Sequence, residues 1–262
     1  MNNNEISIGI VTFMARHELV KSLIHNIRIH SGDNVDIILI INGDNEEYMN
    51  DGYRVEMLNF CAAIKNCYPF FCPEFKSLSK LWNTINIFSR TQYNFIIGDD
   101  TIYDKNVIDD IRQHIEKSKS EFFTLNHGFS HFVITKKILH TIGYFDERLL
   151  ALGEEDGDMV HRHIEIFGKA IDNISTNGIH NSARYDFKPT NAEIHIDNKP
   201  LINKKIREEK YVSDSAGIRG MWDFPLKKKW EDYQQYPYEM FVNKNKKNIK
   251  KFESLDINYE PV

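Results

Sequence analysis

Two apolar runs on either side of an amphipathic stretch constrain the fold of this chain more than any other feature. Residues 6–13 (ISIGIVTF) and 35–41 (VDIILII) are almost entirely apolar and rich in β-branched side chains, as expected of strands buried on both faces. Between them, apolar residues of the stretch 17–29 recur at helical spacing. A strand, a helix and a second strand in this order predict parallel strands joined by a right-handed crossover.

The rest of the first 200 residues continues this alternation. We expect helices over 78–88, 104–116, 136–142 and 159–167, strands over 93–98, 122–125 and 132–135, and short extended pieces at 170–174 and 178–180. Residues 46–75 are less regular, with a short helix near 55–64 and a short strand near 68–71. The pattern predicts an α/β domain, residues 1–200, with a mostly parallel central sheet flanked by helices.

Beyond residue 200 the composition changes, and we treat 201–262 as a C-terminal extension that packs on this domain. Lysines cluster at 227–229 and 244–251, with aromatic residues such as Trp222 before and between the clusters. Aromatic faces can stack against a ligand, which makes Trp222 a candidate binding residue. The lysines could instead meet an anionic membrane surface. The plainer alternative is a solvated tail whose aromatic residues dock on the core.

Composition excludes several classes of protein. The 262 residues carry a net charge of −5, which argues against a nucleic-acid partner because an extended phosphate contact needs a basic surface. Cys61, Cys67 and Cys72 lack a CxxC spacing, so we expect buried free thiols rather than disulfides or a zinc site. No signal peptide opens the sequence, and no apolar run approaches the ~20 residues of a membrane span. We therefore expect a cytoplasmic protein. Peripheral membrane contact through the C-terminal lysines is compatible with that location.

The apolar run at 93–98 ends abruptly in two adjacent carboxylates, Asp99 and Asp100. In an open α/β sheet, ligands bind at the carboxyl ends of the strands. Adjacent carboxylates repel each other and are best tolerated where a cation or hydrogen-bond donors neutralise them. A divalent metal that carries a phosphate would do this. The alternative is an Asp-Asp turn that caps the next helix.

A second acidic cluster, Glu155-Asp156-Gly157-Asp158, and a late histidine, His180, follow in the sequence. Asp100 and His180, with diphosphate oxygens, would suit Mn²⁺ or Mg²⁺; alternatively His180, one of eleven histidines, is structural. The acidic cluster has two alternatives of its own. It could be a fragment of a calcium loop, although its glycine is at the wrong step, or an acidic helix N-terminus favoured by the helix dipole.

Four segments together resemble inverting glycosyltransferases of the GT-A fold. These are 6–13, 35–44 (VDIILIINGD), 94–101 (NFIIGDDT) and 141–162 (TIGYFDERLLALGEEDGDMVHR). The likeness is to the family-two group and to galactosyltransferase and chondroitin-synthase relatives with a Gly-Glu-Asp motif. It covers roughly residues 6–185. Its most specific part is the pairing of 143–147 (GYFDE) with 155–158 (EDGD), which leads into a helix with Arg162.

The resemblance implies a role for each matching residue on the donor side. Asp100 matches the acid that holds the metal on the nucleotide diphosphate, and His180 matches a histidine that completes the metal site. Asp99 matches the acid that touches the ribose. Thr12 and Arg16 match the end of the first strand, which lines the nucleotide.

On the acceptor side, Asp156 matches the general base that deprotonates the acceptor hydroxyl, and Glu155 and Asp158 match neighbours that orient the acceptor. The implied protein is a metal-dependent inverting glycosyltransferase. Since sugars stack on aromatic faces, Trp222 is then a candidate acceptor contact. Its donor would be a UDP-, GDP- or dTDP-linked sugar. Its acceptor would be a hydroxyl of a surface-polysaccharide, lipid-linked or protein-linked glycan.

The chain departs from the family pattern at three places. Gly98 stands where a strict DxD motif has its first acid. Relatives often end the second strand in an acid that reads the base, where this chain offers Asn42 or a displaced Asp44. Asn83 stands in for the Arg-Asn pair that relatives carry near the third helix. The resemblance therefore does not specify the base or the cation on the diphosphate.

Two other functions fit parts of the pattern. A sugar nucleotidyltransferase has a related α/β layout, but should carry a glycine-rich basic loop after the first strand, where 12–16 (TFMAR) has no glycine. A non-catalytic carbohydrate- or nucleotide-binding module could share the scaffold, although the presence of both Asp100 and Asp156 argues against it.

Overall fold

The computed structural model describes residues 6–13, 16–43, 51–73, 75–105, 107–149 and 155–181, and every structural statement below concerns these. Asp44, Trp222 and the extension 201–262 lie outside the described residues, so the predictions for them stay predictions. No helix in the described part is long and apolar enough to cross a membrane.

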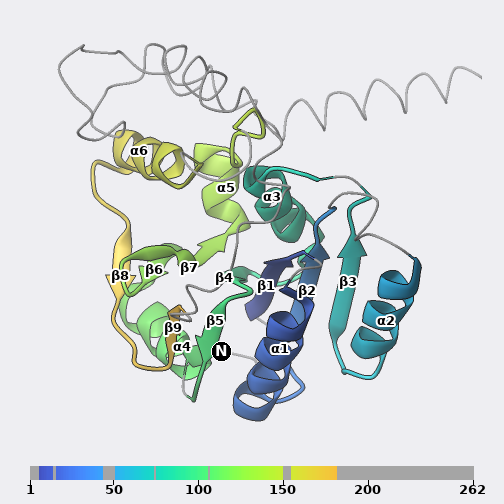
Figure 1. Ribbon diagram of the computed structural model, residues 1–262. Helices are drawn as coiled ribbons and strands as arrows, with labels where there is room; N and C mark the ends of the chain where they lie inside the picture. Colours follow the sequence, from blue (N-terminus) through green and yellow to red (C-terminus); the bar gives the residue numbers. More distant parts are fainter. Residues whose placement is uncertain are drawn as a thin grey trace, which may run out of the picture.

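A seven-stranded sheet forms the centre of the molecule, in the order β3-β2-β1-β4-β7-β6-β8 (Figure 1). Its strands are β1 (Ile6–Thr12), β2 (Asp36–Ile41), β3 (Cys67–Phe71), β4 (Tyr93–Gly98), β6 (Phe122–Leu125), β7 (Gly128–Thr135) and β8 (Asp172–Ile174). The β1, β2, β3 and β4 strands pair in parallel, which confirms the predicted β-α-β unit. The β7 strand runs antiparallel to both β4 and β6.

A second, two-stranded sheet pairs β5 (Thr101–Tyr103) with β9 (Ile179–Asn181) in antiparallel fashion. The β5 strand follows Asp99 and Asp100 directly, and β9 contains His180. Two short extended pieces of the sequence, nearly 80 residues apart, therefore meet beside the end of β4.

Six helices cover the central sheet in two layers. They are α1 (His17–Ser31), α2 (Asp51–Ala62), α3 (Leu78–Phe88), α4 (Val107–Ser118), α5 (Lys136–Ile142) and α6 (Glu155–Phe167). Buried residues of α1, α2 and α4 pack on one face of the sheet, and those of α3, α5 and α6 on the other (Figure 1). Apolar residues therefore cover both faces, which explains why the central strands read as continuous apolar runs.

Most predicted elements are confirmed, with shifts at their ends. The α6 helix begins at Glu155, four residues before the predicted start, because three acidic side chains occupy its first turn, where the helix dipole favours them. The α4 helix begins later than predicted, at Val107. The irregular region holds α2 and β3 close to the predicted positions.

His163 on α6 gives this layer a pH-dependent stability. The buried ring packs against Phe122 and Phe167, with centroid distances of 5.6 and 4.8 Å, and its Nδ1 lies 3.0 Å from the Lys169 carbonyl. Burial lowers the pKa of His163, although the carbonyl opposes this. The folded state therefore prefers the neutral ring. The stability that His163 contributes is fully present above its unfolded-state pKa of about 6.5, and it is lost as the pH falls from there through the lower folded-state pKa.

When the pH is lowered from 7.5 to 5.5, the free energy of unfolding should fall less in His163→Gln than in the wild type. Glutamine keeps an N–H donor but does not take up a proton. Urea unfolding at both pH values measures the difference. The exposed His140, changed to Gln, is the matched control and should behave as the wild type does. An equal loss in His163→Gln and wild type would contradict the prediction.

Candidate active site

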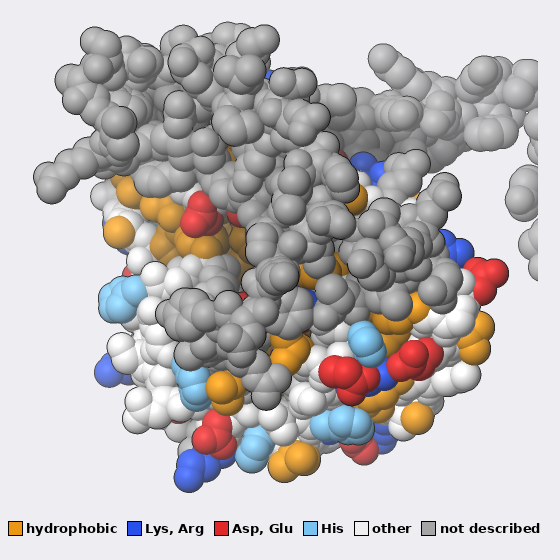
Figure 2. Space-filling view, in the orientation of Figure 1, with side chains coloured by type: hydrophobic (Ala, Val, Ile, Leu, Met, Phe, Trp, Pro, Cys, Tyr) orange, Lys and Arg blue, Asp and Glu red, His pale blue; other side chains and the backbone are white. Residues whose placement is uncertain are grey.

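A cavity of about 350 Å³ lies at the carboxyl ends of β1, β2 and β4, within the range of small-molecule sites. Val11, Leu81, Trp82 and other side chains give it an apolar wall. Its polar lining includes Arg16, Asn42, Asp99, Asp100 and Ser130. On the face shown in Figure 2, Lys and Arg side chains are scattered among Asp and Glu rather than gathered in one patch on the described surface.

Of three residues predicted to face the nucleotide, Arg16 and Asp99 line this cavity, and the fully buried Thr12 bonds to Asp99. Asp99 is 3% exposed; its Oδ2 accepts a hydrogen bond from Thr12 Oγ1 and its Oδ1 from Arg16 Nη1, both at 2.8 Å. The parallel register of β1 and β4, which pairs Val11 with Gly98, brings these residues together. Burial raises the pKa of Asp99 to about 6, against the lowering effect of Arg16 and Thr12.

Arg16 also explains how two adjacent carboxylates coexist here. Its Nη1 lies 3.9 Å from Asp100 Oδ2 as well as 2.8 Å from Asp99 Oδ1. A guanidinium between two carboxylates lowers their mutual repulsion. Arg16 therefore supplies part of the positive charge that two adjacent carboxylates need.

The two residues predicted to hold a metal belong to the β5–β9 pair. Asp100, whose side chain is 42% exposed, directly precedes β5, and Ile102 of β5 pairs with His180 of β9. Both also act on a third residue, His131 of β7: burial lowers the pKa of His131 to about 4, Asp100 opposes this shift and His180 adds to it. A carboxylate and an imidazole are donors that Mn²⁺ accepts, so the residues present fit such an ion.

Gly98 provides room for the Asp100 carboxylate. A Cβ atom at this position would lie 2.8 Å from Asp100 Oδ1. Glycine in place of the first acid of a strict DxD motif thus leaves the space that the Asp100 carboxylate occupies.

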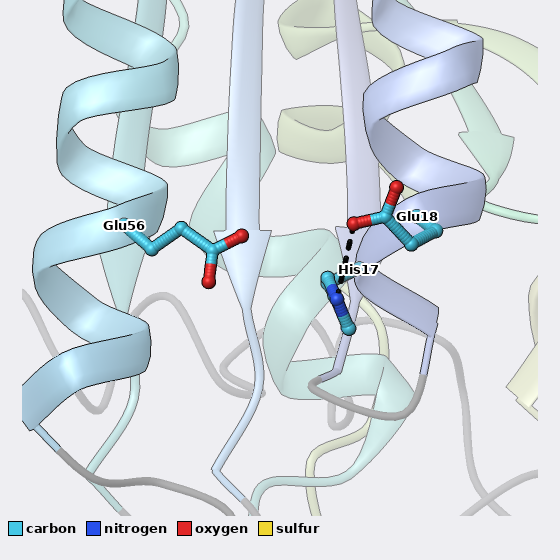
Figure 3. A group of neighbouring side chains, drawn as sticks. All are labelled: His17, Glu18 and Glu56. Atoms are coloured by element: carbon cyan, nitrogen blue, oxygen red, sulfur yellow. Dashed lines mark ion pairs between the residues drawn. The ribbon is translucent and has the colours of Figure 1, made fainter.

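A separate cluster of metal-competent side chains lies on the surface between α1 and α2. Among the described residues, His17, Glu18 and Glu56 are the one group of three whose ligand atoms lie within 4.8 Å of one another (Figure 3). The Lys21 ammonium lies 3.1 Å from Glu18 Oε1 and also contacts Glu56. The carboxylates therefore already share a cation, and we interpret the cluster as a surface ion pair that ties α1 to α2.

Asn42 and Asn83, both predicted to bind the donor, each hold a backbone segment through two hydrogen bonds. The Asn42 amide donates to the Lys76 carbonyl at 3.0 Å and accepts from its N–H at 2.9 Å, so it fixes a wall of the cavity. Asn83 is fully buried, and its amide makes the same two bonds, both 2.9 Å, with the Phe145 backbone. The side chain of Asn83 therefore ties α3 to the segment after α5, and its contact with the donor stays a prediction.

The acidic cluster at the start of α6 divides into buried and accessible members. Glu155 and Asp158 are 5% and 2% exposed, and Asp158 Oδ2 lies 2.9 Å from Nε of the buried Arg162. Asp156 is half-buried, and its Oδ1 accepts a hydrogen bond from the Gly157 N–H at 2.8 Å. The helical conformation excludes the calcium-loop interpretation. The cluster occupies the first turn of α6, as the helix-N-terminus interpretation predicted. Of its three acids, Asp156 is the most accessible.

Sequence reasoning missed Lys76 and His131. Lys76 lies in an irregular segment without periodicity, and His131 is one polar residue inside an apolar strand. Neither has a local pattern that distinguishes it. Only the contacts made in the folded chain reveal them.

No protein-family model and no curated protein matches this sequence. Several solved structures, in contrast, are similar to this chain. S. aureus TarS 1–349 in complex with UDP superposes with a TM-score of 0.53 at 10% identity, over 67% of this chain and 59% of that one. The mannosyltransferase PcManGT from Pyrobaculum calidifontis, in complex with GDP-Man and Mn²⁺, gives 0.50 at 11% identity, over 66% and 54%.

The chain has the GT-A fold. This confirms the predicted architecture, a central sheet flanked by helices. A longer TarS structure gives a TM-score of 0.52 and is covered over only 36% of its length. The chain thus spans between 36% and 59% of these proteins.

Proposed function

We propose that this protein is a metal-dependent, inverting glycosyltransferase that moves a sugar from a nucleotide-diphosphate sugar to a hydroxyl of a glycan. One observation carries the proposal: Arg16, Asp99 and Asp100 line one cavity, and Thr12 holds Asp99 there through a hydrogen bond. Proteins of the same fold bind UDP, and GDP-Man with Mn²⁺, which supports a nucleotide-diphosphate-sugar donor; we propose one linked to UDP, GDP or dTDP. The cavity suits such a donor because its apolar wall stands next to the charged groups.

The donor side stabilises charge on the leaving diphosphate. When the bond from sugar C1 to the diphosphate breaks, negative charge grows on the departing oxygen. Mn²⁺ or Mg²⁺ held by Asp100 and His180 would supply Lewis-acid neutralisation of that charge. Arg16, fixed by its bond to Asp99, adds a positive charge that needs no reorganisation.

The acceptor side supplies the base. Asp156 takes the proton of the acceptor hydroxyl as its oxygen attacks C1 from the face opposite the diphosphate, and this single displacement inverts the anomeric centre. Its accessibility supports the assignment, because Glu155 and Asp158 are buried. Asp158 instead pairs with Arg162, which supports a positioning role for it in the helix start.

Gly98→Ala is expected to lower the affinity for Mn²⁺ by about 10-fold, because the new methyl group displaces the Asp100 carboxylate. The atom displaced is the end of a movable side chain, so stability should change by less than about 1 kcal/mol. Isothermal titration with Mn²⁺ measures the affinity. In an Asp100→Ala background the same change should have no further effect; unchanged affinity in Gly98→Ala alone would contradict the prediction.

A screen of nucleotide sugars with and without Mn²⁺ tests the function. A donor at about 100 times its dissociation constant should stabilise the protein by roughly 2.7 kcal/mol, and free UDP, GDP or dTDP should appear when acceptor is present. Stabilisation without release would indicate a binding module. Pyrophosphate release from a nucleoside triphosphate and a sugar 1-phosphate would indicate a nucleotidyltransferase. The absence of any metal-dependent shift would overturn the proposal.

A further inference from the structure

Two consecutive residues of β7, Ser130 and His131, hold the end of the β5–β9 pair that faces the cavity. The buried His131 ring shares a hydrogen bond with Thr101 through its Nε2, which lies 3.1 Å from Thr101 Oγ1. Ser130 Oγ accepts a hydrogen bond from Asn181 Nδ2 at 3.3 Å. Thr101 and Asn181 are partners in the β5–β9 register. One dipeptide of the central sheet therefore contacts both members of one cross-strand pair.

Each contacted residue follows one of the two prospective metal ligands. Thr101 comes directly after Asp100, and Asn181 directly after His180. The separation of Asp100 and His180 thus depends on how the β5–β9 pair is attached at this end. The ring of His131 lies close enough to both for each to affect its pKa.

The opposite end of the pair is held differently. Tyr103 and Ile179 are buried register partners in the hydrophobic core, and Tyr103 Oη lies 2.6 Å from Ser31 Oγ. The strands have three residues each, and a two-stranded pair this short is not stable alone. Core packing therefore fixes one end, and the bonds to Ser130 and His131 fix the end that bears the metal ligands.

We propose that Ser130 and His131 are positioning residues for the divalent-cation site: they set the separation of Asp100 and His180, and so the affinity for Mn²⁺, without contacting the ion. This inference rests on the proposed function, since it takes Asp100 and His180 as ligands. A buried imidazole is costly unless it is hydrogen-bonded, and here its partner is the hydroxyl next to Asp100.

Titration of the metal-free full chain with Mn²⁺, followed by the electron paramagnetic resonance signal of the free ion, tests the proposal. His131→Leu and Thr101→Val remove the same hydrogen bond from its two sides. Each should weaken Mn²⁺ binding by about 10- to 100-fold, the size of effect seen for residues that orient ligands, and the double variant should be no weaker than the single ones. His131→Gln, which keeps a hydrogen-bonding group, should recover most of the affinity.

Two controls separate this inference from the proposed function and from loss of folding. Asp100→Asn identifies the ion bound at this site, because the His17, Glu18 and Glu56 cluster is intact in it. His163→Gln perturbs another buried histidine, away from β5 and β9, and should bind Mn²⁺ as the wild type does. All titrations are run where circular dichroism shows a folded chain. Wild-type affinity in His131→Leu, with loss in Asp100→Asn, would overturn the inference alone; equal binding by wild type and Asp100→Asn would overturn the metal site and the inference together.

Discussion

Replacing Asp156 by Asn is expected to slow sugar transfer by about 10²- to 10⁴-fold, the usual contribution of a positioned base. The amide has the shape of the carboxylate, and its oxygen can still accept the bond from the Gly157 N–H, so α6 keeps its first turn. It cannot take a proton from the acceptor hydroxyl. The expected result is an enzyme that binds its donor normally and turns it over slowly.

The measurement compares kcat, the KM for the donor, and Mn²⁺ affinity in wild type and Asp156→Asn. A change confined to kcat is expected, because among the described residues none from α6 lines the cavity. Glu165→Gln, an exposed change on the same helix, is the matched control. Undiminished turnover in Asp156→Asn would remove Asp156 from the role of base.

Replacing Arg162 by Met is expected to destabilise the fold by about 3–5 kcal/mol, the range for removing one partner of a buried ion pair. The side chain of Arg162 is 1% exposed; its Nε lies 2.9 Å from Asp158 Oδ2, and its Nη1 donates to the Ile142 carbonyl at 2.6 Å. Methionine fills similar volume, but it leaves a buried carboxylate without its guanidinium partner and the end of α5 without a donor.

Urea unfolding gives the free energy for this comparison. Lys137→Met, which breaks the exposed pair with Glu121, should cost less than about 1 kcal/mol and shows what an ordinary surface ion pair contributes. Combining Arg162→Met with Asp158→Leu should recover part of the loss, since both charges of the buried pair are then replaced by apolar groups. A loss below about 1 kcal/mol in Arg162→Met would show that the pair is not a structural element.

The sequence predicted most of the fold because periodicity is a local property. Alternation between apolar runs and helical spacing located the β-α-β unit, β4 and α5. Adjacency along the chain also pointed to Asp99 and Asp100, and the resemblance pointed to Thr12 and Arg16, which the structure brings together. These residues stand at strand ends, where topology alone decides which side chains meet.

What the sequence could not supply is the partner of each polar side chain. The buried Asn83 bonds the Phe145 backbone, far away in the sequence, and the buried Asp158 pairs with Arg162 of its own helix. Whether an amide or a carboxylate faces a cavity or the core depends on helix rotation and on contacts between distant segments. His131 shows the converse, since its relation to Asp100 exists only through the β4–β7 and β5–β9 pairings.

The reversal of direction at β7 brings the first residues of a hairpin strand to the rim of the cavity. Because β7 runs against β4, pairing His131 with Ile97, the start of β7 lies beside the carboxyl end of β4. The turn before it, Asn126 and His127, has φ values of 56° and 61°, typical of a two-residue hairpin. This turn is bonded to the chain beside it: the Asn126 N–H donates to the Ile174 carbonyl, and the Asn126 side-chain amide donates to the Thr176 and Ile179 carbonyls. A longer 126–127 turn would therefore disturb the segment that leads into β9, whereas Thr12, Arg16 and Asp99 are held to one another at the ends of two parallel strands.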